Sequence, residues 1–178
     1  MISLTDDRIF NEVERAIKKY GTRNPFELLD AMGAVTRITH DFHRDGLKGY
    51  CAIMHRTEYV FINGNLPNAE QKVVAGHEAA HLTIHKPQIM SSPIRAMRDF
   101  NLYDNSGRIE REANSFLADF IVSDDDTLDV IKTSYDYFSA AQELYIPAPL
   151  FAFKLYSMMR RGYDVKNPVD LDSRFLGR

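Results

Sequence analysis

The chain has 178 residues, of which 44% are hydrophobic and 26% are charged, a composition that excludes intrinsic disorder as the main state. The formal net charge is −3, which disfavours direct nucleic-acid binding through a strongly basic surface. Because Cys51 is the single cysteine, an intramolecular disulfide framework is excluded. The length predicts one domain, or one domain with a small appendage.

The sequence contains neither a secretion signal nor a membrane span that we can recognise. The N-terminus lacks a basic region followed by an apolar stretch, so we expect no signal peptide. Nowhere do 18 apolar residues follow one another, as a membrane-spanning helix requires. We therefore expect a soluble cytoplasmic protein.

The N-terminal segment predicts two helices. Apolar residues recur at helical spacing over residues 6–20, and Gly21 is a natural end for this helix. Asn24 and Glu27 stand three residues apart in a capping-box pattern, which predicts the start of a second helix. We expect this second helix to end at Gly33.

The next segment predicts strands. Residues 35–42 form one candidate, and residues 50–55 and 59–63 form a predicted hairpin with its turn at 56–58. The last of these runs is apolar and rich in β-branched and aromatic residues, as is typical of a strand in a sheet.

The middle of the chain predicts two helices separated by a loop. Asn68 and Gln71 form a second capping-box pattern, and the helix that begins there should end at Pro87. Residues 88–107 are expected to be rich in loops. Apolar residues at helical spacing predict another helix over 108–122.

The C-terminal part predicts helices over 127–144 and 148–161, divided by prolines. We therefore divide the chain into a core of residues 1–126, a helical subdomain of residues 127–163 and a loose tail of residues 164–178.

An HExxH motif, His77 to His81, lies on the long predicted helix. Its two histidines are one helical turn apart, with about 5–6 Å between their Cβ atoms, so that both can bind one zinc ion. Glu78 beside them could accept a proton from a zinc-bound water and deliver it to a leaving amine. The alternative is a pair of core histidines next to an ordinary surface glutamate.

A catalytic zinc site needs a third protein ligand. His85 lies about 12 Å from His77 along the same helix, too far to share an ion to which each bond is about 2 Å long. On the 108–122 helix, Glu110 and Glu112 point in nearly opposite directions, so only one can face the metal. Helical geometry favours Glu110, which shares its face with Asn114, and the amide of Asn114 could support a zinc-binding histidine.

Several sequence blocks together resemble the ImmA/IrrE family of zinc metallopeptidases, in particular the short anti-repressors of phages and mobile elements. The HExxH motif is accompanied by four blocks similar to those of the family: residues 19–27, 47–50, 61–71 and 109–118. The last block is similar to the family's ExxAN pattern. The family's glutamate ligand falls on Glu110, in agreement with the helical argument.

The resemblance implies an α+β, gluzincin-like fold with a small antiparallel or mixed sheet packed on the HExxH helix, followed by helix-turn-helix-like C-terminal helices. It implies a zinc endopeptidase with metal ligands His77, His81 and Glu110 and with Glu78 as general base. The implied substrate is a helix-turn-helix repressor, held as an extended segment against a sheet edge, for which residues 59–63 are our candidate.

Several alternatives stay open. Tyr103 could stabilise the oxyanion or simply pack as an aromatic residue. Cys51 could be a redox sensor, although a buried inert thiol is favoured. The C-terminal helices carry Lys154 beside an apolar stripe, which favours packing over DNA recognition. The alternative function is a non-catalytic regulator, a partner-binding protein or a toxin–antitoxin component on the same scaffold.

Overall fold

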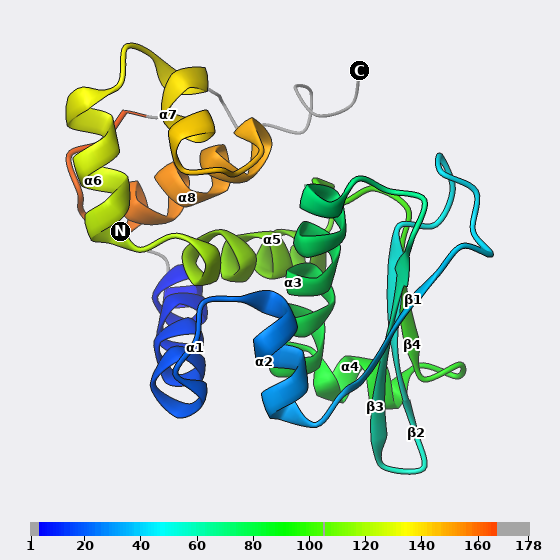
Figure 1. Ribbon diagram of the computed structural model, residues 1–178. Helices are drawn as coiled ribbons and strands as arrows, with labels where there is room; N and C mark the ends of the chain where they lie inside the picture. Colours follow the sequence, from blue (N-terminus) through cyan, green and yellow to red (C-terminus); the bar gives the residue numbers. More distant parts are fainter. Residues whose placement is uncertain (1–3, 105, 167–178) are drawn as a thin grey trace. The chain divides into compact units, whose positions relative to one another are not determined.

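A computed structural model describes residues 4–104 and 106–166, and within these residues the chain forms eight helices and four strands (Figure 1). The α+β class is therefore confirmed. The chain divides into two compact units: Ala16–Leu102, here the sheet unit, and Met1–Arg15 with Tyr103–Arg178, here the helical unit. No helix among the described residues is long and apolar enough to cross a membrane. The predicted tail of residues 164–178 lies largely outside the described residues.

The sheet unit contains a mixed four-stranded sheet and the helices that cover it. Its strands are arranged in the order β1-β3-β2-β4, with β1 parallel to β3 and the other two pairs antiparallel. In chain order its elements after α1 (Leu4–Tyr20) are α2 (Pro25–Met32), β1 (Val35–Thr39), β2 (Gly49–Met54), β3 (Thr57–Asn63), α3 (Asn68–Ile84), α4 (Lys86–Ser91) and β4 (Ala96–Asp99).

The position of β3 corrects the expected substrate edge. β3 pairs with β1 on one side and β2 on the other, so the segment 59–63 is internal to the sheet. The backbone N–H and C=O groups of an internal strand are already used by its neighbours, which leaves nothing for a substrate strand to pair with. The two edges of the sheet are β1 and β4.

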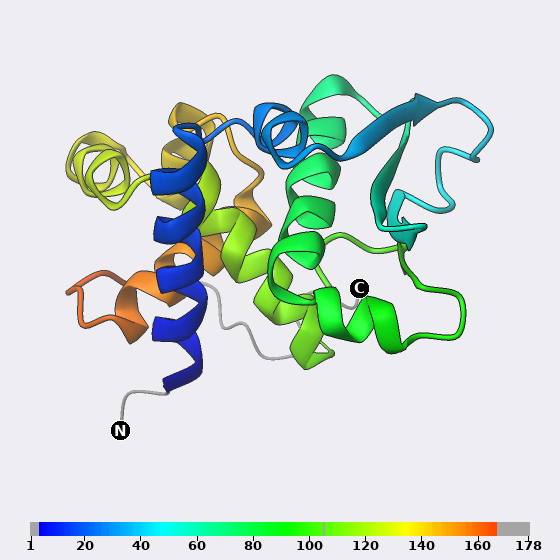
Figure 2. The same ribbon diagram turned by 90° about the horizontal axis from the view of Figure 1, so that it is seen from below.

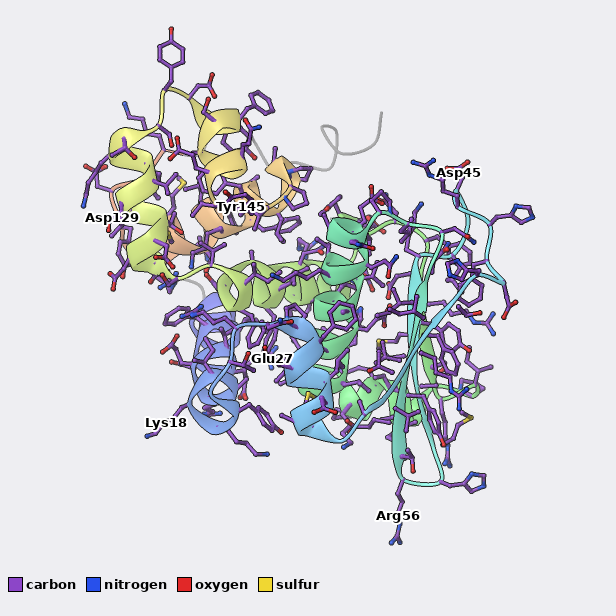
Figure 3. All side chains as sticks on the ribbon, viewed as in Figure 1. Lys18, Glu27, Asp45, Arg56, Asp129 and Tyr145 are labelled. Atoms are coloured by element: carbon purple, nitrogen blue, oxygen red, sulfur yellow. The ribbon has the colours of Figure 1, made fainter. Side chains whose placement is uncertain are left out.

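The connections in the sheet unit also differ from the prediction. The hairpin turn comprises His55 and Arg56, both with positive φ, and not residues 56–58; Arg56 lies at its tip (Figure 3). Positive φ at both central residues is the geometry that matches the twist of paired strands. The expected loop at 88–107 contains most of α4 and all of β4.

One face of the sheet packs on the helices. Cys51, Val60 and Ile62 are fully buried, and α3 contacts both β2 and β3. Figures 1 and 2 show α2, α3 and α4 on this same side of the sheet. On the opposite face the rings of Tyr50 and Phe61 stack with their centroids 4.5 Å apart. The predicted packing of a small sheet on the HExxH helix is confirmed.

The start of α3 does not use the expected capping box. Pro67 stands at the N-cap without a side-chain hydrogen bond, and α3 already includes Asn68. Instead, the Gln71 side chain donates a hydrogen bond of 2.8 Å to the carbonyl of Leu66, which secures the approach to the helix. α3 ends at Ile84, three residues before the expected Pro87.

The helical unit contains α5 (Arg108–Ile121), α6 (Asp124–Thr133), α7 (Tyr137–Glu143) and α8 (Ala148–Arg160), together with the first part of α1. The helix expected over 127–144 is two helices, because Asp136 caps a new helix by accepting a hydrogen bond from the Ser139 amide. The division of the chain at residue 126 stays a prediction.

A partly buried group of charges, here the C-terminal ion network, joins α5, α6 and α8: Asp119, Asp124, Lys154 and Arg161. The Lys154 ammonium lies 2.9 Å from Asp119 and 2.7 Å from Asp124, and its side chain is 1% exposed. Lys154 is therefore occupied in the interior of the helical unit, as the packing alternative requires.

Candidate metal centre

The two histidines of the HExxH motif lie on one buried face of α3. His77 and His81 are both 0% exposed, and their Nε2 atoms are 3.0 Å apart. This agrees with the prediction from helical spacing that the two rings can reach one ion. Burial of the pair lowers the local dielectric, which strengthens the charge interactions made there.

Asp99, the last residue of the edge strand β4, faces the same point. Its Oδ1 lies 3.5 Å from His77 Nε2, and its Oδ2 lies 3.8 Å from His81 Nε2. One ligand atom from each of the three residues lies within 4.8 Å of the other two. Sequence reasoning missed Asp99, because it carries no motif and stands in a segment that was expected to be loop.

The chemistry of these donors suits zinc. Two imidazoles and a carboxylate are a donor set that zinc accepts in catalytic sites. Burial acts to raise the pKa of Asp99, but hydrogen bonding to His77 and the charge of that ring outweigh it, so the pKa is lowered overall. The carboxylate form, which can bind a cation, is thereby favoured.

His85 contacts the ring nitrogen of His81 that faces away from His77. It follows the end of α3, and its amide donates to the carbonyl of His81. Its ring is buried, and its Nδ1 lies 3.0 Å from His81 Nδ1. A partner at Nδ1 fixes the orientation of the His81 ring and turns its Nε2 toward His77. The sequence excluded His85 as a ligand but did not reveal this supporting contact.

Glu78 lies at a close approach between α3 and β2. It is fully buried, and a Cβ placed on Gly49 would lie only 3.0 Å from Glu78 Oε1. The nearby Cys51 thiol is also buried, and burial followed by the negative charge of Glu78 raises its pKa well above the usual value. A thiol of this kind is inert, which favours the buried thiol over the redox sensor.

The candidate residues of α5 belong to the helical unit. Glu112 pairs with Arg8 at 3.0 Å and with Arg108 at 2.8 Å, so it serves the packing of that unit. Glu110 lies in the first turn of α5 and is half-buried. Asn114 donates to the carbonyl of Asp104 at 3.2 Å. Among the two glutamates, Glu110 therefore keeps its place as the metal-ligand candidate, while Tyr103 stays an untested oxyanion candidate.

Comparison with known proteins identifies the family. The profile of the peptidase M78 family, described as the IrrE N-terminal-like domain, matches residues 32–156, which is more than half of the chain. The chain belongs to this family. The matched residues of this M78 member include α3 and β4, which carry the histidines and Asp99, as well as α5.

A phage protein is also similar to this M78 member. It is described as "Uncharacterized immunity region protein 2" of Bacillus phage phi105 and is 33% identical over 112 residues. The match covers 63% of this chain and 66% of the phage protein, slightly less than two thirds of that relative. No solved structure matches the chain significantly.

Proposed function

We propose that this M78 member is a zinc-dependent endopeptidase that cleaves a helix-turn-helix repressor, with His77, His81 and Glu110 as zinc ligands and Glu78 as general base. The observation that carries the proposal is the convergence of two buried Nε2 atoms, 3.0 Å apart, in a chain of the peptidase M78 family. Glu110 is included because it occupies the glutamate position of the ExxAN block.

Glu78 would perform the proton transfers of the reaction. When bound, zinc acts as a Lewis acid and lowers the pKa of water to about 7. Glu78 then accepts a proton from the attacking water and delivers it to the amine that leaves when the peptide bond breaks. Its burial supports this role, because a water-poor environment strengthens the electrostatic interactions of the carboxylate.

The substrate would bind as an additional strand. Since β3 is internal, we assign the docking edge to β4, which pairs only with β2 among the described strands and carries Asp99 at its end. Main-chain hydrogen bonds along β4 would hold an extended peptide beside the histidines. The relative from a phage immunity region supports a repressor as the substrate, because immunity regions of phages encode repressors.

The test compares wild-type protein with Glu78→Gln and with the matched control Glu70→Gln on the same helix. Purified proteins are loaded with zinc and incubated with helix-turn-helix repressors from the same genome, and cleavage is followed by mass spectrometry. We expect Glu78→Gln to retain zinc and to lose cleavage, while Glu70→Gln cleaves as wild type does. Intact repressor in all three reactions would instead support the non-catalytic alternative.

A further inference from the structure

The two ring nitrogens of His81 have different partners, and this difference distinguishes a metal ligand from a residue that only supports one. His81 directs Nδ1 to His85 and Nε2 to His77. The Asp99 carboxylate faces the Nε2 atoms of both His77 and His81, which are the atoms available to a metal. A carboxylate that merely supports a zinc-binding histidine contacts the other nitrogen of the ring. Asp99 therefore stands in the position of a ligand and not in that of an outer support.

The distances between the histidine nitrogens and the Asp99 carboxylate also fit a shared zinc ion. Ligands bonded to zinc at about 2.0–2.1 Å in a tetrahedral arrangement lie about 3.3 Å from one another. The observed separations are 3.0 Å between the two Nε2 atoms and 3.5 Å between His77 Nε2 and Asp99 Oδ1. The second carboxylate oxygen, Oδ2, is buried and accepts no hydrogen bond from the described residues. A buried carboxylate oxygen without a donor is costly unless a cation compensates its charge.

We propose that Asp99 binds the zinc ion directly and completes, with His77 and His81, a set of three ligands contained within the sheet unit. This inference rests on the proposed zinc site and deepens it. Two histidines and one carboxylate are a sufficient donor set for a catalytic zinc site.

The test measures zinc affinity on the full-length protein by competition with a chromophoric chelator. Loss of an outer support lowers metal affinity by about 10–100-fold. We expect Asp99→Asn to lower it by more than about 100-fold and Asp45→Asn to behave as wild type. Asp45 is the matched control, because it is an exposed aspartate in the loop between β1 and β2 (Figure 3).

A second variant tests direct coordination even if Asp99→Asn folds poorly. Cysteine is itself a zinc ligand, with a bond of about 2.3 Å, so Asp99→Cys should retain the metal. Loaded with Co²⁺, it should show the near-ultraviolet charge-transfer absorption of a metal–thiolate bond. Wild-type protein, which contains only Cys51, should lack this absorption.

The proposal and the function on which it rests fail in different ways. A loss below about 100-fold in Asp99→Asn, or a folded Asp99→Cys without the thiolate absorption, would overturn Asp99 as a ligand. If His77→Ala still abolishes zinc binding in that case, the proposed zinc site survives. Unchanged zinc binding in His77→Ala would overturn the site as a whole.

Discussion

Gly49→Ala tests a close approach between α3 and the sheet. A Cβ at position 49 would lie 2.4 Å from Val74 Cγ1 and 3.0 Å from both the Phe61 carbonyl oxygen and Glu78 Oε1. The Glu78 carboxylate could rotate away, but the Phe61 oxygen is backbone in the central strand, and Val74 is a short β-branched side chain on α3. The added methyl group therefore forces α3 away from β2.

The magnitude follows from two opposing effects. Overpacking a tight core costs about 1–3 kcal/mol of unfolding free energy. Replacing glycine by alanine recovers about 0.4–1 kcal/mol, because the unfolded chain loses conformational freedom. We expect a net loss of about 1–2 kcal/mol, which lowers the Tm by about 2–8 °C for a domain of this size.

The assay combines thermal unfolding, followed by circular dichroism, with zinc content and repressor cleavage. Zinc should stay bound, because the histidines remain, whereas cleavage should fall at least about tenfold, since small displacements of a catalytic group are costly. The control is Gly46→Ala, whose Cβ would meet its nearest neighbours at 3.4 and 3.5 Å, an ordinary contact. If the Tm values of the Gly49 and Gly46 variants agree within about 1 °C, the close approach of α3 and β2 is refuted.

Three further predictions concern the charged groups and His85. Lys154→Ala should cost about 3–5 kcal/mol in urea unfolding, because it removes the buried ammonium that pairs with both Asp119 and Asp124 and leaves Arg161, at 3.4 Å, as the cation beside Asp119. The exposed control Lys132→Ala should cost less than about 1 kcal/mol, and equal costs would contradict a buried network. Burial acts to raise the pKa of Asp124, but the two cations of the C-terminal ion network outweigh it and lower the pKa. The resulting stabilisation is present above the unfolded pKa of about 3.9 and is lost as the pH falls below it, so Asp124→Asn should flatten the acid limb of a stability–pH curve. His85→Ala should lower zinc affinity by about 10–100-fold in chelator competition, and an unchanged affinity would show that the contact with His81 does not orient its ring.

The features that the sequence could predict are those decided by neighbouring residues. The pairing of His77 with His81 follows from one helical turn, and it needs no knowledge of the rest of the fold. The end of α2 at Gly33 follows equally from a single left-handed residue. The choice of Glu110 over Glu112 as ligand candidate also began from helical periodicity, and the pairing of Glu112 with Arg8 supports it.

The features decided only by the tertiary structure depend on partners distant in the sequence. The apolar sequence of β3 is compatible with an edge strand and with a central strand. Its central position is set by its pairing with β1 and β2. β4 has only four residues, too few for a recognisable alternation, and it is ordered by its pairing with β2. That pairing brings Asp99 to the two histidines. The sequence by itself therefore determined the two histidines of the candidate metal centre. The position of Asp99 beside them was decided by strand pairing, because hydrogen bonds between strands join residues that no local pattern connects.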